Sequence, residues 1–198
     1  MRATLGQGAR RRGEALVAND IGETLISAEA IAERVSGLGA ALSDLYAGRE
    51  PVIVAIMKGC VPFLADLVRA WPGPMHLEFM SAESYHGTQA GEVRLSLPTD
   101  FAHRVAGRHV LVVDDIYDTG ATLTKACGAI AALEPADLRT LVLLRKRLAS
   151  PPAPPADAPL REPDWVGFDI EDRFVIGYGL DYNGLYRNLP YLAALRQG

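Results

Sequence analysis

The sequence predicts an α/β fold with a mostly parallel, twisted sheet flanked by helices. Short, continuous apolar runs occupy residues 52–56 and 110–113, and the run at 110–113 is rich in β-branched residues; such runs are typical of strands buried on both faces of a parallel sheet. Residues 139–144, RTLVLL, predict another strand. The first two runs are each followed by a loop of small residues and then by a helical pattern, at residues 61–70 and 123–133. Strand, loop and helix in this order form the repeating unit of an α/β sheet.

Length and charge narrow the class of protein. The chain has 198 residues, which suits one domain, or one domain with a small appendage. Its formal net charge of −4 argues against a nucleic-acid-binding protein, whose surface would be basic. No apolar run approaches membrane-spanning length. Neither a nucleic acid nor a membrane is therefore an expected partner.

The N-terminus and the cysteines predict a cytoplasmic protein. Arg10, Arg11 and Arg12 form a cluster, but no apolar segment follows them, so this segment is interpreted as a tail and not as a secretory signal. Cys60 and Cys127 lie far apart and belong to no metal-type cluster. Two free thiols in a reducing cytoplasm are the expectation.

The first helix is expected over residues 27–47. Ser27 has the residue type of an N-cap, and Gly48 ends the apolar pattern. The apolar positions recur at steps of four and three and form one core-facing stripe of Ile31, Val35, Leu38, Leu42 and Leu45. We assign this helix to the core, with no chemistry of its own.

A loop with a lysine follows the strand at residues 52–56. Lys58 and Gly59 stand at the carboxyl end of that strand, where open α/β sheets bind ligands. Pro62 fits the first turn of the helix at residues 61–70, because its missing N–H costs nothing there. Lys58 therefore either meets a polyphosphate or is a solvated loop lysine.

Two further strands enclose a long polar loop. Residues 75–80 and 92–97 alternate between apolar and polar side chains. The loop between them, at residues 81–91, reads SAESYHGTQAG and is longer than most hairpin connections. Long polar loops beside an active site are often lids. The alternative is a loop with no role.

Acidic and small residues follow the strand at residues 110–113. Asp114 and Asp115 come directly after it, Asp118 comes three residues later, and the run TGAT at residues 119–122 opens the next helix. Backbone N–H groups at such a helix start face a phosphate, and the helix dipole favours the anion. The threonines add hydroxyl donors, and the glycine allows a close approach of the backbone. The segment predicts a phosphate site.

Three carboxylates beside a phosphate need a reason, because like charges repel. They make sense if the ligand also offers hydroxyls, a metal ion, or a proton to be removed. A sugar phosphate bound with a divalent cation satisfies all three conditions. The alternative is that Asp114 and Asp115 are turn residues and that Asp118 is a helix N-cap.

Cations follow the strand at residues 139–144. Arg145, Lys146 and Arg147 stand at its carboxyl end. They can serve an anionic ligand, or one of them can donate to a carbonyl oxygen of a substrate. The alternative is a solvated basic turn.

The last third of the chain begins with a proline-rich stretch. Residues 149–163 read ASPPAPPADAPLREP, which predicts an extended surface connection. A docking segment for a proline-recognising domain is the alternative. Short strands are expected at residues 165–168 and 175–179, with an acidic turn between them. Trp165 is either a core aromatic or a flat surface for a ring to stack on.

Together these motifs resemble those of the 6-oxopurine phosphoribosyltransferases, the hypoxanthine-guanine type. The stretch VLVVDDIYDTGATL is similar to the diphosphoribosyl-binding signature of that family. The family's order is also followed by AIMKGCVPFLADL, ESYHG, LLRKR, WVGFDIEDRFVIGYGLDY and YRNLPYL. The resemblance extends from Ala30 to the end of the chain.

The resemblance implies the type I phosphoribosyltransferase fold with a small hood built from the N- and C-terminal segments. It divides the chain into four parts. These are a tail and part of the hood at 1–26, a phosphoribosyltransferase core at 27–148, a proline-rich surface connection at 149–163, and a purine-binding hood with the C-terminal segment at 164–198.

The resemblance also implies roles for the acidic and small residues. Asp118 would act as general base on the imidazole nitrogen of the purine. Mg²⁺ is the implied cofactor, with Asp114, Asp115 and Asp172 as metal ligands. The phosphoribosyl group would be held by Asp114, Asp115, Thr119, Gly120, Ala121 and Thr122.

Further roles fall on the loops. Lys58, Gly59 and Arg187 would contact pyrophosphate, and Ser84 and Tyr85 would lie on the closing lid. A cis peptide bond between residues 57 and 58 is also compatible with the resemblance, and the sequence leaves it open.

The purine would be bound by four residues. Lys146 would donate to its exocyclic oxygen, and Trp165 would stack on the ring. Val166 would read the edge of the base through backbone groups, and Ile116 would complete the pocket.

The implied reaction belongs to purine salvage. Phosphoribosyl is transferred from phosphoribosyl pyrophosphate to hypoxanthine or guanine, which gives IMP or GMP and pyrophosphate. Positive charge builds on the ribose as pyrophosphate leaves, and the carboxylates favour that charge. The partners are therefore small-molecule substrates, and the family suggests a homodimer or homotetramer.

Alternatives remain on the same scaffold. A xanthine-preferring enzyme is one, because Trp165, Tyr117 and Glu171 depart from the family's usual residues and leave the base preference open. An RNA-binding regulator of a pyrimidine operon is another, although it would need a basic face. A purely structural nucleotide-binding protein would not need a general base.

Overall fold

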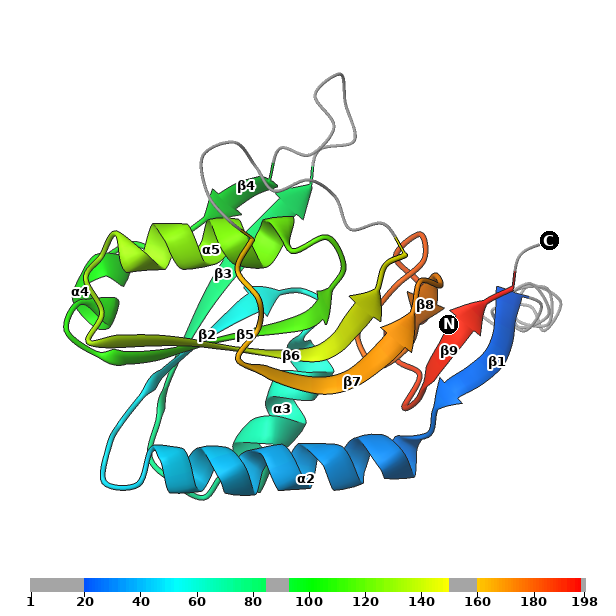
Figure 1. Cartoon of the computed structure of the whole chain (residues 1–198), viewed down its shortest axis with the longest axis horizontal. Helices are drawn as coiled ribbons and strands as arrows, with labels where there is room; N and C mark the ends of the chain where they lie inside the picture. The colour runs from blue at the N-terminus through cyan, green and yellow to red at the C-terminus, as the bar shows by residue number, and fades with distance from the viewer. Residues whose placement is uncertain (1–19, 85–92, 150–159, 197–198) are drawn as a thin grey trace, which may run out of the picture.

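A computed structural model describes residues 20–84, 93–149 and 160–196 of the chain. The larger sheet has six strands in the order β4-β3-β2-β5-β6-β7, and its neighbouring strands are parallel except for β3 and β4 (Figure 1). This confirms the predicted α/β class. The strands are β2 (Val52–Met57), β3 (His76–Ser84), β4 (Val93–Ser96), β5 (His109–Tyr117), β6 (Asp137–Arg147) and β7 (Trp165–Glu171).

Different helices cover the two faces of this sheet (Figure 1). In β2, Ile53 and Ala55 pack into one hydrophobic core with α2 and α3. Val52 and Val54 point the other way and pack with α4 and α5. A strand covered on both faces reads as a continuous apolar run, which is why the sequence predicted it well. The helices are α2 (Ala28–Leu45), α3 (Val61–Ala70), α4 (Phe101–Val105) and α5 (Ala121–Ala131).

The helix boundaries agree with the sequence patterns, with some exceptions. The Ser27 side chain accepts a hydrogen bond from the Ala30 N–H at 3.2 Å, which confirms the N-cap of α2. Leu45 was expected in the core, but it is 40% exposed. Helix α5 begins at Ala121, two residues earlier than predicted. Helix α4 was not predicted, because five residues are too few to show a helical period.

Several strands run further than the sequence predicted. β3 reaches Ser84, so residues 81–84 of the expected loop belong to a strand, and β7 reaches Glu171. β5 continues to Tyr117 and β6 to Arg147, because Tyr117 still pairs with Arg145 in the register of the sheet. Asp114 and Asp115 therefore lie in a strand, and the alternative of turn residues is wrong. The three cations likewise belong to the end of β6 and not to a basic turn.

A second, three-stranded sheet brings the two ends of the described chain together. It has the order β1-β9-β8, and β9 pairs antiparallel with both neighbours. We call this sheet and the connecting residues 172–191 the hood. The hood lies beyond the carboxyl ends of β6 and β7 (Figure 1). Its strands are β1 (Ile21–Ile26), β8 (Val175–Ile176) and β9 (Leu192–Leu195).

The structure also bears on the cysteines and on the possibility of a membrane-spanning helix. Cys60 and Cys127 are buried and unpaired, as predicted. None of the helices in the ranges given above has the length and apolar character needed to cross a membrane. The arginine cluster at residues 10–12 and residues 150–159 of the proline-rich stretch lie outside the described residues.

Candidate active site

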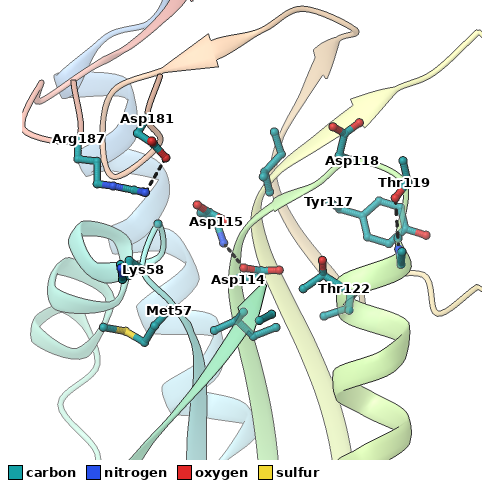
Figure 2. Close-up of a pocket in the computed structure, with 17 residues that line it drawn as sticks. Met57, Lys58, Asp114, Asp115, Tyr117, Asp118, Thr119, Thr122, Asp181 and Arg187 are labelled. Atoms are coloured by element: carbon teal, nitrogen blue, oxygen red, sulfur yellow. Dashed lines mark hydrogen bonds and ion pairs between the residues drawn. The ribbon is translucent and has the colours of Figure 1, made fainter. Parts of the chain in front are cut away.

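A pocket of about 270 Å³, which we call the edge pocket, lies at the carboxyl ends of β2 and β5 (Figure 2). Lys58 and Gly59 line it from the loop after β2, and the Met57–Lys58 peptide bond is cis. The end of β5 and the residues after it line the opposite side, while Asp181 and Arg187 reach in from the hood. This is the edge at which open α/β sheets bind ligands.

Two carboxylates lie in the middle of the edge pocket (Figure 2). The Asp115 N–H donates to Asp114 Oδ1 at 3.0 Å, and Asp114 is only 5% exposed. Burial raises the pKa of Asp114 well above its usual range, and the neighbouring Asp115 adds to this; burial also raises the pKa of Asp115. Because a buried charge without a partner is costly, this pair suits a ligand that brings a cation or hydroxyl donors.

Gly59 allows three segments to meet beside these acids. A Cβ built on Gly59 would lie 1.5 Å from Asp115 Oδ2, so a larger residue would displace the carboxylate. Gly179 of the hood has a φ of +103°, and a Cβ built there would lie 1.9 Å from the Gly59 carbonyl oxygen. The loop after β2 is therefore packed between β5 and the hood.

Residues Asp118–Thr122, which we call the threonine loop, connect β5 to α5. Gly120 is the N-cap of α5, with a φ of +80° and no side chain to cap the helix. Thr119 Oγ1 lies 3.5 Å from the Ala121 nitrogen, which is a weak contact. The first amides of α5 and the hydroxyls of Thr119 and Thr122 line the edge pocket. They are donors placed for an anion.

Neighbouring groups hold Arg187 in position. Its guanidinium donates to the Gly179 carbonyl oxygen and pairs with the Asp181 carboxylate. Asp181 also accepts a hydrogen bond from the Gly184 N–H at 2.8 Å. A cation and a carboxylate of the hood thus lie across the edge pocket from Asp115 (Figure 2).

A second pocket of about 180 Å³, which we call the hood pocket, adjoins the edge pocket. Ile116 lines it from β5, Lys146 from β6, and Phe174 and Val175 from the hood. Phe174 is 49% exposed. An exposed flat ring beside polar donors suits an aromatic ligand that also hydrogen-bonds. The two pockets share Asp115, Ile116, Asp118, Asp181 and Arg187.

Lys146 connects the hood pocket to the threonine loop. Its Nζ lies 3.1 Å from Asp118 Oδ2 and 3.4 Å from Asp172 Oδ1, while the side chain is 12% exposed. A buried stem with its ammonium at the boundary of a pocket is a typical arrangement of lysine. The ammonium can donate to a ligand in the hood pocket next to the Asp118 carboxylate.

The structure brings most of the predicted site residues to this one edge. Ser84 is the last residue of β3, and Tyr85 lies outside the described residues, so the lid stays a prediction. The residues that line the two pockets as expected are Lys58, Gly59, Asp114, Asp115, Ile116, Asp118, Thr119, Gly120, Ala121, Thr122, Lys146 and Arg187.

The placement of Trp165 and Val166 on the base-binding surface is wrong. They open β7, where Trp165 pairs with Leu141, whereas Lys146 pairs with Ile170 at the other end of the strand. The five steps from Trp165 to Ile170 span about 16 Å. Trp165 packs instead against the core beneath α2 and α3, and Val166 against the core of the opposite face.

Asp172, the third predicted metal ligand, lies outside the pocket that Asp114 and Asp115 line. It contacts Lys146, its side chain is 60% exposed, and it lines neither the edge pocket nor the hood pocket. The hood carboxylate that does line the edge pocket with Asp114 and Asp115 is Asp181.

Sequence reasoning missed Phe174, Val175 and Asp181. The signal was present, because ligands lie beyond the carboxyl ends of strands. For the strand that starts at Trp165, this rule points to the residues after Glu171 and not to its first residues.

The acids fit a magnesium ion that binds together with a substrate. Within the described ranges, no group of three or more His, Cys, Asp or Glu side chains forms a ready-made metal cage. Mg²⁺ is usually held through one or two carboxylates, with water and substrate phosphate oxygens as the other ligands. Asp114, Asp115 and Asp181 offer such oxygen donors in the edge pocket.

Comparison with known proteins agrees with this geometry. The family model for the phosphoribosyl transferase domain matches residues 23–183. The chain is 38% identical to the hypoxanthine-guanine phosphoribosyltransferase of Streptococcus pneumoniae over 182 residues, which covers 92% of this chain and 97% of the relative. The enzyme of the same name from Lactococcus lactis is 39% identical over 178 residues, with 89% and 92% covered.

Solved structures give the same result. A hypoxanthine phosphoribosyltransferase from Staphylococcus aureus has a TM-score of 0.79 at 34% identity, with 91% of this chain and 95% of that chain covered. The Trypanosoma cruzi enzyme, solved with its product IMP, has a TM-score of 0.76 at 35% identity, with 89% and 95% covered. Since the family model spans most of the chain and these relatives align over nearly their whole length, the chain belongs to the phosphoribosyltransferase family, in its hypoxanthine-guanine group.

Proposed function

We propose that the edge pocket binds phosphoribosyl pyrophosphate and that the hood pocket binds the 6-oxopurine. As a hypoxanthine-guanine phosphoribosyltransferase, the chain serves purine salvage by making IMP or GMP and releasing pyrophosphate. The observation that carries the assignment of the pockets is the position of Asp118. It belongs to the anion-binding threonine loop and also lies 3.1 Å from Lys146 of the hood pocket.

The 5′-phosphate binds at the threonine loop. The start of α5 offers backbone N–H groups there, and Thr119 and Thr122 add hydroxyl donors. The helix dipole favours the phosphate charge. This contact fixes the sugar with its reacting carbon toward the hood pocket.

Asp114 and Asp115 bind the ribose hydroxyls and, with Asp181 opposite them, hold the magnesium ion. With Mg²⁺ bound, the negative charge of the leaving pyrophosphate is neutralised. Burial raises the pKa of both carboxyls, because it disfavours their ionised forms. A bound cation or a hydroxyl donor would stabilise those ionised forms.

Pyrophosphate lies between the loop after β2 and the hood. Lys58 and Arg187 are the cations that line this part of the edge pocket. Gly59 allows the backbone to approach the anion closely. The two cations lower the energy of the leaving group as its bond to the sugar carbon loosens.

The purine stacks on Phe174 in the hood pocket. Lys146 donates to the exocyclic oxygen, and backbone groups of Val175 contact the edge of the ring. Ile116 covers the apolar side of the pocket. Because Lys146 donates to the exocyclic oxygen, the pocket selects 6-oxopurines over adenine. Adenine carries an amino group at that position, which would leave the Lys146 ammonium without an acceptor.

Asp118 accepts the proton of the purine imidazole nitrogen as the reaction proceeds. The bond from the sugar carbon to pyrophosphate breaks, and the purine nitrogen forms its bond to the same carbon. Positioned general bases contribute about 10²–10⁴-fold in such steps. Because Lys146 contacts Asp118, a purine held by Lys146 is brought beside the base.

Ser84 and Tyr85 remain the predicted lid residues. Ala82 of β3 lines the edge pocket and Ser84 ends that strand, while Tyr85 lies outside the described residues. Closure of a lid would keep water from hydrolysing the activated sugar.

The chain assembles as a homodimer or homotetramer in the cytoplasm. Apolar side chains remain exposed on α3 and β3, namely Val61 at 44%, Leu77 at 40% and Phe79 at 44%. These side chains are candidates for a surface that a second subunit covers. We keep the proposed division into a core, at residues 27–148, and a purine-binding hood; Phe174 and Val175, which line the hood pocket, support it.

A spectrophotometric assay tests the proposal directly. The chain is supplied with Mg²⁺ and phosphoribosyl pyrophosphate, and with hypoxanthine, guanine, xanthine, adenine or uracil in turn. We expect turnover with hypoxanthine and guanine, loss of turnover on chelation of Mg²⁺, and none with adenine or uracil. Fastest turnover with xanthine would support the xanthine-preferring alternative, and inactivity with every 6-oxopurine would contradict the proposal.

A further inference from the structure

Tyr117 ends β5 directly before the threonine loop, and its ring supports that loop. Tyr117 is only 7% exposed. A Cβ built on Gly120 would lie 2.5 Å from the Tyr117 hydroxyl oxygen and 3.0 Å from Cε2, so the loop packs directly on the ring. Figure 2 shows this ring beside Thr119, with its hydroxyl pointing away from Asp114 and Asp115. The backbone of the threonine loop thus rests on an aromatic surface.

The Tyr117 hydroxyl is tied to a segment distant in sequence. It donates to Glu162 Oε1 at 3.2 Å, and Glu162 Oε2 lies 3.8 Å from the Arg145 guanidinium. Burial, with a further contribution from Glu162, raises the pKa of Tyr117 to about 12, so the hydroxyl remains a protonated donor at neutral pH. Glu162 lies near the end of the proline-rich stretch, so this bond connects that stretch to the residue that precedes the threonine loop.

The segment around Glu162 is itself anchored. The Arg161 N–H donates to Thr124 Oγ1 in the first turn of α5 at 2.8 Å. The Arg161 guanidinium pairs with Asp164 at 3.2 Å, and Asp164 accepts the Thr140 N–H of β6 at 2.9 Å. The residues on either side of Glu162 are therefore anchored to α5 and β6, while the Glu162 side chain itself is 69% exposed.

We propose that Tyr117 and Glu162 form a brace that positions the threonine loop for the 5′-phosphate. The inference rests on the proposed function, in which this loop binds that phosphate. Its donors are backbone N–H groups and threonine hydroxyls, so their directions depend on the path of the backbone. The Tyr117 ring supports that path at Gly120, and the bond to Glu162 keeps the ring in place. Tyr117 is a positioning residue, because it acts through the loop.

The brace acts on one end of the site. Lys58 and Arg187, which bind pyrophosphate in the proposal, lie across the edge pocket from Tyr117 (Figure 2). Loss of the brace should therefore weaken ligands that carry a 5′-phosphate and leave pyrophosphate binding unchanged. A general loss of structure would weaken both.

The test compares two ligands on the full chain. Tyr117→Phe keeps the ring and removes only the hydroxyl. Calorimetric titration should show IMP binding weakened about three- to tenfold, the size of one hydrogen bond, with a parallel rise in KM for phosphoribosyl pyrophosphate. The Kd of pyrophosphate with Mg²⁺ should stay within about twofold, since no hydrogen bond to it changes. Unchanged IMP binding, or equal weakening of both ligands, would overturn the brace.

Matched variants separate the brace from simple loss of a buried hydroxyl. Tyr46→Phe removes a buried hydroxyl that has no hydrogen-bond partner in the described part of the chain. Tyr46 is the C-cap of α2 and lines neither the edge pocket nor the hood pocket. It should change neither ligand. Glu162→Ala should match Tyr117→Phe, and the double variant should bind IMP no more weakly than either single variant. Fully additive losses would contradict the brace, and failure of the wild-type chain to bind IMP would contradict the proposed function itself.

Discussion

The edge pocket and the hood pocket adjoin each other, yet they are assembled in different ways. The phosphoribosyl side of the edge pocket comes from one uninterrupted segment, residues 114–122, in which a strand end, a loop and a helix start follow one another. The hood pocket takes Lys146 from β6 and Phe174 and Val175 from the hood. A contiguous segment carries its geometry in its local backbone, whereas a dispersed pocket depends on how one sheet is placed against another.

Direct contacts set the placement of the hood. The Tyr178 hydroxyl donates to Asp66 of α3 at 2.6 Å, and Gly179 packs on Gly59. If the two pockets hold different parts of the reaction, substitutions in each should have separable effects. Changes in the hood pocket should affect the purine, and changes in the threonine loop should affect the sugar phosphate or the chemical step.

The largest effect is expected at Asp118, which the two pockets share. Asp118→Asn removes the general base but keeps the shape of the side chain, so kcat should fall by about 10²–10⁴-fold while phosphoribosyl pyrophosphate still binds. Steady-state kinetics with a binding titration measure both. Asp172→Asn is the matched control, because Asp172 is the other carboxylate that contacts Lys146, and it should stay near wild-type. Full activity of Asp118→Asn would remove the base from the mechanism.

A smaller, selective effect is expected at Lys146. Lys146→Ala removes a charged donor from the hood pocket, so KM for hypoxanthine should rise about 10-fold or more. The KM for phosphoribosyl pyrophosphate should change far less. Arg147→Ala is the control, since Arg147 pairs with Asp169, is 73% exposed and does not line the hood pocket. An unchanged purine KM in Lys146→Ala would contradict the assignment of the purine to the hood pocket.

The stacking surface gives the next test. Phe174→Ala should raise the purine KM about fivefold to tenfold, at the lower end of the free energy of ring stacking on an aromatic side chain. Trp165→Phe should leave the purine KM unchanged, because Trp165 lies at the opposite end of β7 from Lys146. The reverse pattern would restore the original assignment of Trp165 and contradict the position of the hood pocket.

These two aromatic residues show how far the sequence could be interpreted. The β-branched run before Asp114, and the loop and helix after it, predicted the strand, the acids and the anion site, because all of these are local. The resemblance places base binding on Trp165 and Val166, which stand at the start of β7 and not at its carboxyl end. The rule that ligands lie beyond the carboxyl ends of strands points to Phe174, and the parallel register, with Ile170 opposite Lys146, agrees with it.

The hood and the brace could not be derived from local patterns at all. The pairing of β1 with β9 joins the two ends of the described chain. The bond between Tyr117 and Glu162 joins residues 45 positions apart in the sequence. Neither contact has a signal in hydrophobic periodicity, which reports only which face of an element is buried. Long-range polar contacts of this kind become visible only in three dimensions.

The smallest expected effect is on thermal stability. Substitution of an acid in the edge pocket should change Tm in the opposite direction to substitution of a paired acid elsewhere. Burial raises the pKa of Asp114, so its ionised form destabilises the ligand-free folded state. This penalty is absent below the unfolded pKa of about 3.9, and it grows as the pH rises through the raised pKa of the folded state. Asp114→Asn should therefore raise Tm near neutral pH, by about 2–4 °C for each kcal/mol recovered, and the gap should close toward pH 4.

Asp169 gives a control of opposite sign. Its hydrogen bonds to Arg145 and Arg147 lower its pKa to about 2, so its contribution to stability is present at neutral pH and is lost as the pH falls through the range from about 4 to 2. Asp169→Asn should lower Tm at neutral pH, where Asp114→Asn raises it. A buried carboxylate that costs stability without its ligand is expected at a binding site, whereas a paired surface carboxylate contributes to the fold. If thermal unfolding across this pH range showed the same sign for both variants, Asp114 would be a structural residue, and the edge pocket would lose its strongest electrostatic argument.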